Sequence, residues 1–205
     1  MNSKLAEYVR LLASWPGLIG RGEDAERLAE DSLVLLPFLE GARSLVDVGS
    51  GGGMPGIPLK LARPDLAVTL VEADQAKAAF LEHAAAALDI ELTVIAERAE
   101  TAARRPELRE AFDAATCRAL ASLPVAAELC LPFVRLGGRL LAMRSGAEAA
   151  WAGAPLLGGG EPEVVAAPSP LRDRGVVVVI PKETPTPDLY PRRPGVPGKR
   201  PLGKL

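Results

Sequence analysis

Short apolar runs alternate with amphipathic stretches along most of this chain. The runs at 45–48, 66–71, 91–96, 112–117 and 139–144 have the β-branched content and the length of buried strands. Between them, residues 56–62, 74–88, 100–105 and 123–131 show helical spacing of apolar positions. Strands that alternate with helices in this way predict an α/β domain built on a mostly parallel sheet.

The two ends of the chain depart from this alternation. Two amphipathic helices are expected at 4–14 and at about 23–38, as a short helical cap before the first strand. Near the other end, a turn at 136–138 leads into the fifth strand, and 163–167 and 175–180 read as an antiparallel hairpin at the sheet edge. We therefore predict a cap at 1–43, a seven-stranded domain at 44–183 and a proline-rich tail at 184–205.

Composition and charge narrow the class of protein. With 205 residues and a formal net charge of −2, the chain has no overall basic character, so any nucleic-acid surface must be local. Cys117 and Cys130 lie in apolar surroundings without metal or redox spacing and are predicted to be buried free thiols. No signal peptide or spanning segment is apparent, which predicts a soluble cytoplasmic protein without a membrane partner.

The chemistry is predicted to centre on the first strand and the turn after it. Asp47 is the one charge in that strand, and glycines follow at 49, 51, 52, 53 and 56. Such a turn between a strand and a helix lets a ligand approach the backbone closely at the carboxyl end of the sheet. At the end of the next strand, Glu72 is placed to accept hydrogen bonds from the two hydroxyls of a ribose.

Two cofactors fit this pattern, and both remain open at this stage. Gly51, Gly53 and Gly56 satisfy the dinucleotide signature G-x-G-x-x-G. However, Pro55 and Pro58 crowd the helix start, whose N–H groups would hold a pyrophosphate. S-Adenosylmethionine has no phosphate and tolerates their loss, so the pattern favours the methyl donor over NAD. Gly51 is then a cofactor-binding residue of the turn.

The motifs continue in order beyond the glycine turn. The stretch Asp47-Val-Gly-Ser-Gly-Gly-Gly-Met-Pro-Gly-Ile-Pro-Leu59 is followed by Leu70-Val-Glu72 and by Cys117-Arg-Ala-Leu-Ala-Ser-Leu123. Tyr190-Pro-Arg-Arg-Pro-Gly195 stands near the end of the chain. Over residues 30–202, this order resembles the bacterial 16S ribosomal RNA guanine-N7 methyltransferases called RsmG or GidB. Asp31-Ser32 is similar to an Asp-Ser step of that family.

The resemblance implies a class I, Rossmann-like methyltransferase fold and assigns roles to particular residues. S-Adenosylmethionine is the implied cofactor and S-adenosylhomocysteine its product, with no metal. The implied substrate is 16S ribosomal RNA or the small ribosomal subunit, and a monomer is expected. The positions that match the family's cofactor contacts, with Glu72 at the ribose and Arg118 beside the methyl group, are Gly49, Met54, Glu72, Ala99, Glu100 and Arg118.

The residues that bind RNA are predicted from charge as well as from the resemblance. From residue 191 onward the tail has five basic residues and no acidic one, which indicates an arm that meets phosphates. Packing of Tyr190 and the prolines on the domain is the alternative. The RNA-binding candidates are Lys77, Arg144, Arg192, Arg193, Lys199 and Arg200, with Lys204 also in the basic tail. Departures from the family pattern on this side fall at 18–20, Glu30 and Ala78.

Methylation at guanine N7 requires no general base, because that nitrogen already has a free lone pair. The only histidine, His83, lies in an alanine-rich helix and is interpreted as a surface or packing residue. Catalysis is therefore expected from alignment of the reactants, with Arg118 as the candidate positioning residue. A small-molecule methyltransferase and a non-catalytic nucleotide- or RNA-binding module on the same fold remain as alternatives.

Overall fold

One twisted sheet runs through the molecule in this computed structural model, which describes residues 3–20, 22–146 and 151–203. Its seven strands in this described part follow the order β3-β2-β1-β4-β5-β7-β6. Neighbouring strands are parallel from β3 to β5, whereas β7 is antiparallel to both β5 and β6. The strand bounds are β1 Ser44–Val48, β2 Ala67–Val71, β3 Thr93–Ile95, β4 Phe112–Arg118, β5 Val134–Arg144, β6 Glu163–Ala166 and β7 Val176–Pro181.

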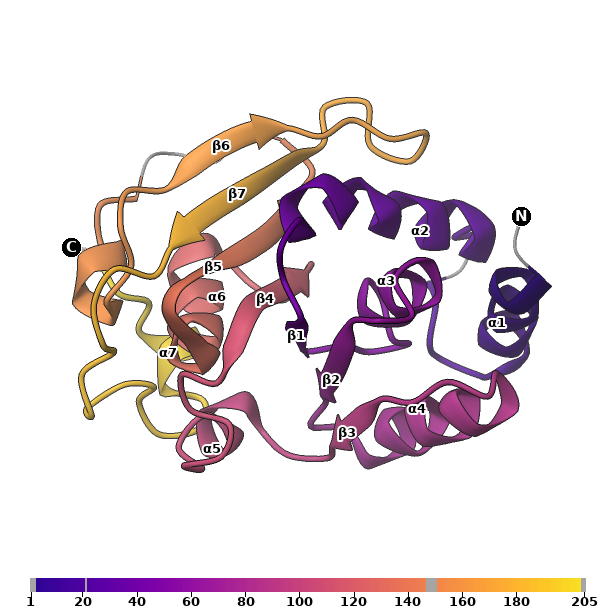
Figure 1. Cartoon of the computed structure of the whole chain (residues 1–205), viewed down its shortest axis with the longest axis horizontal. Coiled ribbons are helices and arrows are strands. Elements are labelled where there is room, and N and C mark those ends of the chain that lie inside the picture. Colours follow the sequence, from indigo (N-terminus) through magenta and orange to yellow (C-terminus); the bar gives the residue numbers. More distant parts are fainter. Residues whose placement is uncertain (1–2, 21, 147–150, 204–205) are drawn as a thin grey trace.

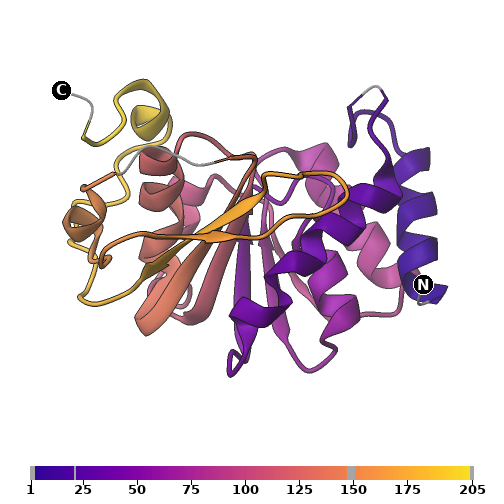
Figure 2. The same cartoon turned by 90° about the horizontal axis from the view of Figure 1, so that it is seen from above.

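Helices cover both faces of the sheet (Figures 1 and 2). On one face lie α1 Ser3–Ser14, α2 Ala25–Ser32, the 3-10 helix η1 Leu33–Leu39, α3 Gly56–Ala62 and α4 Gln75–Ala87. On the other lie α5 Ala99–Ala102, α6 Leu123–Cys130 and α7 Val196–Lys199, with the short 3-10 helices η2 Leu131–Phe133 and η3 Ala154–Leu157. This is the predicted α/β architecture with a parallel sheet and an antiparallel edge.

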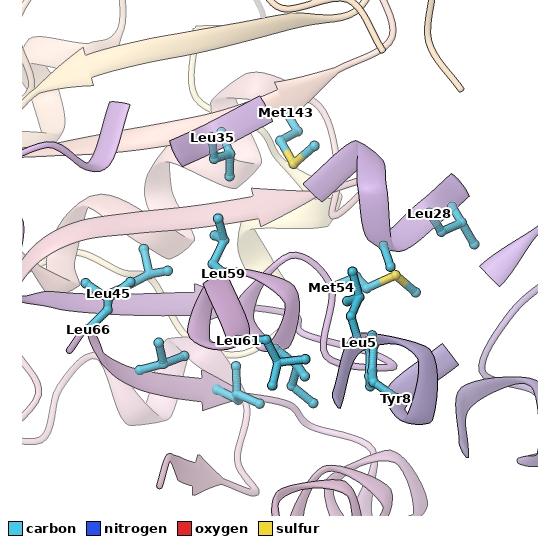
Figure 3. Close-up of a cluster of buried hydrophobic side chains, with 14 of the residues drawn as sticks. Leu5, Tyr8, Leu28, Leu35, Leu45, Met54, Leu59, Leu61, Leu66 and Met143 are labelled. Atoms are coloured by element: carbon cyan, nitrogen blue, oxygen red, sulfur yellow. The ribbon is translucent and has the colours of Figure 1, made fainter. Parts of the chain in front are cut away.

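Each face of the sheet has its own hydrophobic core. The first lies under α1 to α4 and includes Tyr8, Leu45, Met54 and Leu59, which Figure 3 shows gathered between these elements. The second lies under α5 and α6 and takes in Tyr190 from the tail. Cys117 and Cys130 are buried free thiols in this second core, as predicted. Because β1, β2 and β4 are mostly buried between the two helical layers, their carboxyl ends are fixed relative to one another.

Local signals set most element boundaries. The carboxylate of Asp74 accepts hydrogen bonds from the N–H groups of Ala76 and Lys77, so it is the N-cap of α4, as expected. Helix α3 begins at Gly56, directly after Pro55, and has Pro58 in its first turn. His83 contacts the ring of Trp15 at a centroid distance of 5.7 Å, which is a packing role.

The structure corrects three of the predicted boundaries. The helix expected at about 23–38 is split, because Pro37 cannot donate within an α-helix and the chain tightens into η1. The turn expected at 136–138 is instead an irregularity inside the longer β5, where a Cβ on Gly138 would lie 2.5 Å from the Asp113 carbonyl oxygen. The third strand is shorter than expected, at Thr93–Ile95.

The tail folds back on the domain, although its sequence alone left open whether it would pack there. Arg104 and Arg109 donate to carbonyl oxygens between Thr186 and Pro191. The buried Lys182 amine donates to Thr186 and forms an ion pair with Glu110 at 3.1 Å. Lys204 lies outside the described residues. Within the described residues, no helix is long and apolar enough to cross a membrane.

Candidate active site

The predicted cofactor residues converge at the carboxyl ends of β1, β2 and β4. A cavity of about 240 Å³ opens there, and it is lined by the glycine turn, the end of β2, the start of α5 and the end of β4. Its lining includes six of the seven predicted cofactor residues, Gly49, Gly51, Glu72, Ala99, Glu100 and Arg118, together with Lys77, which was predicted as an RNA-binding residue. The topology brings them together because parallel strands end at the same edge of the sheet.

Glu72 ties the glycine turn to the start of α4. One carboxylate oxygen accepts from the Gly51 N–H at 2.8 Å, and the other accepts from the Asp74 N–H at 2.8 Å. The side chain is nearly buried at the cavity wall. An ionised carboxylate has about four lone-pair positions, so these two bonds leave acceptor capacity for hydroxyl groups of a ligand.

Gly51 gives the cavity room for a ligand. Its φ of +56° lies in the left-handed region, and a Cβ added there would meet no protein atom within 4 Å. Its neighbour Gly52 is held from behind, where the buried hydroxyl of Tyr8 donates to the Gly52 carbonyl at 2.7 Å. The cap helix α1 therefore fixes the turn, and the bare backbone of Gly51 faces open space.

Met54 and Asp47 support the turn and are absent from the residues that line this cavity. Met54 is buried beside Tyr8 and Leu5 in the first core (Figure 3), and its sulfur lies 3.7 Å from Nη2 of Arg118. The fully buried Asp47 accepts from the Gly56 N–H at 3.0 Å and so holds the start of α3.

Burial of Asp47 also sets its ionisation. Loss of water raises the pKa of Asp47 to about 7, against the opposing effects of the Gly56 N–H and of Arg118. Among the described residues, its Oδ1 atom has no hydrogen-bond partner. A protonated carboxyl is compatible with such a site, because it avoids an uncompensated buried charge.

This raised pKa predicts a pH-dependent stability. A carboxyl whose folded-state pKa lies above its unfolded value stabilises the protein at low pH, and that contribution is lost as the pH rises from about 4 through about 7. Asp47→Asn is expected to remove this pH-dependent loss of stability. The free energy of unfolding of the variant should therefore rise relative to that of the wild type as the pH increases across that range. Urea unfolding at several pH values checks this, with the exposed Asp173→Asn as control. Parallel curves for wild type and Asp47→Asn would contradict the expectation.

Glu100 joins the cofactor cavity to the tail. Burial opposes its ionisation, yet hydrogen bonds from Arg98 and from the Gly195 N–H hold its pKa below the usual value. The carboxylate lies 2.8 Å from Nη2 of Arg98, which also lines the cavity. Arg98 was not among the predicted cofactor residues, and its position at the start of α5 is the signal that could have found it.

A second cavity, of about 430 Å³, adjoins the first. Arg118 and Ala119 line both, and the other described residues that line the second are Arg144, Arg172 and residues 143, 145 and 146. Ala119 has a φ of +50°, an uncommon conformation for a residue with a Cβ. Arg144 was predicted from sequence, whereas Arg172 was not, because it lies in a polar loop whose position depends on distant contacts.

The basic residues of the tail separate into two kinds. The guanidinium of Arg192 donates to the buried carboxylate of Glu128 at 2.8 and 2.6 Å, and its backbone N–H also donates to that carboxylate. Arg193, Lys199 and Arg200 are exposed. Charge in the sequence did not distinguish these two groups, because the partner of Arg192 lies on α6.

A family model described as "GidB: rRNA small subunit methyltransferase G" matches residues 1–152. Proteins named "Ribosomal RNA small subunit methyltransferase G" are similar over most of their length. The one from Roseiflexus sp. strain RS-1 is 42% identical over 84% of this chain and 81% of its own. The one from Rubrobacter xylanophilus is 41% identical over 98% and 83%.

Solved structures of low sequence identity share the fold. Cofactor-bound Rv0187 from MTB has a TM-score of 0.64 at 17% identity and covers 90% of this chain and 92% of its own. A mutant of MtNAS in complex with S-adenosylmethionine has a TM-score of 0.59 at 16% identity, over 88% and 72%. These likenesses concern the fold alone.

Proposed function

The chain belongs to the GidB family, rRNA small subunit methyltransferase G, and we propose that it methylates N7 of a guanine in 16S ribosomal RNA, with S-adenosylmethionine as the methyl donor. One observation carries the proposal. The cavity that contains the glycine turn and the carboxylate of Glu72 meets a second, arginine-lined cavity, and Arg118 and Ala119 form the wall between them. A methyl donor and an RNA nucleotide can thus approach each other at that shared wall.

The lining residues fit the donor. Gly51 leaves space beside the backbone, and Glu72 provides acceptors suited to ribose hydroxyls. Ala99 and Glu100 form the part of the wall where we expect the adenine, and Gly49 and Arg118 also line the cavity. When bound, S-adenosylmethionine supplies an activated methyl group on a positively charged sulfur.

The chain's own contribution is alignment. Because guanine N7 has a free lone pair, no side chain needs to remove a proton. Holding two reactants in the reactive geometry is worth up to about 7–11 kcal/mol in well-aligned systems. Arg118 sits between the cavities and is tethered by long contacts, 3.3 Å to the Leu28 carbonyl and 3.9 Å to Asp31. It is a positioning residue in this proposal.

The experiment is a methyl-transfer assay with purified protein. Labelled S-adenosylmethionine should transfer its methyl group to 16S RNA or 30S subunits from cells that lack this protein, and N7-specific cleavage should locate one guanine. RNA from cells that contain the protein is the control, since its site is already methylated. Transfer only to small metabolites would support the small-molecule alternative. Cofactor binding without any transfer would support the non-catalytic module.

The exposed tail residues are expected to bind the RNA backbone. Replacing Arg193, Lys199 and Arg200 by alanine should weaken RNA binding. The plot of log affinity against log salt concentration should also become less steep, its negative slope losing about 2–3 in magnitude. Filter binding over a salt series measures both quantities. Affinity for S-adenosylhomocysteine should not change, which serves as the control for folding. An unchanged salt slope would contradict an RNA role for this surface.

The cellular setting follows from the same proposal. Ribosomal subunits are assembled in the bacterial cytoplasm, and we place the protein there as a monomer. Size-exclusion chromatography with light scattering, in the presence and absence of 16S RNA, tests the oligomeric state.

A further inference from the structure

Three arginines from separate parts of the chain meet at the second cavity. Arg118 ends β4, Arg144 ends β5, and Arg172 comes from the loop between β6 and β7. Figures 1 and 2 show this loop reaching across to α2. Guanidinium groups repel one another, and a nearby anion offsets that repulsion. The charge balance around Arg118 and Arg172 therefore bears on what this cavity binds.

One carboxylate accounts for part of it. Asp31 of α2 is fully buried and accepts from Nε of Arg172 at 2.8 Å and from the Ser169 hydroxyl at 2.5 Å. The same carboxylate lies 3.9 Å from Nη1 of Arg118. Asp31 therefore links the cap, the hairpin loop and the arginine at the shared wall, but it supplies one negative charge to two guanidiniums.

The guanidinium of Arg172 has donor capacity that the described residues do not use. Its Nη1 donates to the Arg144 carbonyl and its Nε donates to Asp31, whereas its Nη2 is buried without a hydrogen-bond partner in the described part of the chain. The side chain is only 11% exposed. A buried donor of this kind is uncommon in folded proteins, and a bound anion is one explanation for it.

We propose that this cavity is a phosphate subsite for the substrate nucleotide, with Arg172 and Arg118 as the groups that hold the phosphate. Arginine presents paired N–H donors in a plane that matches phosphate oxygens. The subsite rests on the proposed RNA substrate and deepens it, because it names the part of the nucleotide that the hairpin loop recognises. Asp31 positions Arg172 for this contact.

The location favours RNA phosphate over the carboxylate of the methyl donor. The cofactor cavity contains the glycine turn and the acids Glu72 and Glu100, whereas no residue of that turn lines the second cavity. Among the described residues, the two cavities share Arg118 and Ala119. With the donor on the glycine side of that wall, the arginine side is left for the acceptor and its negative charges.

Arg172→Lys is the central test, because a lysine keeps a positive charge beside Asp31 but has no second donor arm for a phosphate. We expect the variant to bind a 16S RNA transcript about tenfold more weakly in the presence of S-adenosylhomocysteine. The Michaelis constant for RNA methylation should rise by a similar factor. Arg174→Lys, an exposed arginine two residues further along the same loop, is the matched control and should match wild type.

A second variant covers the case in which the lysine substitutes well for arginine. Arg172→Gln can still donate to Asp31 but has no charge. The negative slope of log RNA affinity against log salt concentration should therefore lose about 1 in magnitude. Thermal melting reports whether each variant is folded, and the affinity for S-adenosylhomocysteine is measured separately as a readout of donor binding.

The outcomes separate the two proposals. If wild type methylates RNA and both Arg172 variants keep its RNA affinity and salt slope, the phosphate subsite is wrong and the proposed function stands. If the variants lose S-adenosylhomocysteine affinity and keep RNA affinity, Arg172 holds the donor's carboxylate and the subsite assignment is also wrong. If wild type transfers no methyl group to RNA, the proposed function itself fails.

Discussion

Replacing Gly51 by alanine is expected to weaken binding of S-adenosylmethionine about 100-fold while the protein remains folded. The added methyl group would meet no protein atom, so the core has no need to rearrange. It would instead occupy space at the wall of the 240 Å³ cavity, where the ligand must approach the backbone. Overpacking of a closely fitted site costs about 1–3 kcal/mol, and about 1.4 kcal/mol corresponds to a factor of ten in affinity.

A matched control separates this ligand effect from backbone strain. Gly41 also has a positive φ, at +76°, and a Cβ there would likewise meet nothing within 4 Å, but Gly41 lies outside the cavity. Each substitution should cost about 1–2 kcal/mol of stability, because alanine is disfavoured in the left-handed region. Isothermal titration should then show lost affinity for Gly51→Ala alone. Equal affinity in the two variants would mean that the donor does not pass beside Gly51.

The cofactor side of this site could be predicted from sequence because its signals are local. A β-branched run, a cluster of glycines and an acid at the end of the next strand each indicate structure within a few residues. Parallel topology then places strand ends together, so Gly51, Glu72, Glu100 and Arg118 meet without further information. Met54 lay in the same local pattern, but its side chain turns into the core.

The arginines could not be sorted in the same way, because their roles depend on partners far along the chain. Arg172 reaches Asp31 across 141 residues, and Arg192 reaches Glu128 across 64. Nothing near Arg192 distinguishes it from Arg193, which is exposed. The one local hint was Glu128 itself, an isolated acid in the apolar helix α6 that needs a buried partner.

This buried pair is the basis of the second large effect. Glu128→Ala is expected to lower the free energy of unfolding by about 2–3 kcal/mol, because it removes the buried acceptor of the Arg192 hydrogen bonds, while the guanidinium, which is 21% exposed, regains part of its solvation. Glu128 is fully buried and accepts three hydrogen bonds from Arg192, two from the guanidinium and one from the backbone. Arg192→Ala should cost more, about 3–5 kcal/mol, since it leaves the fully buried carboxylate of Glu128 without its partner.

A double variant and an exposed pair make the Glu128 experiment decisive. With Glu128→Leu and Arg192→Leu combined, much of the loss should be recovered, because neither charge is then left alone. Glu107→Ala, which removes one partner of the exposed 2.6 Å pair with Arg105, should leave stability unchanged. Urea unfolding measures all four proteins. If Glu128→Ala behaves like Glu107→Ala, the pair does not anchor the tail, and Arg192 becomes available again as an RNA contact.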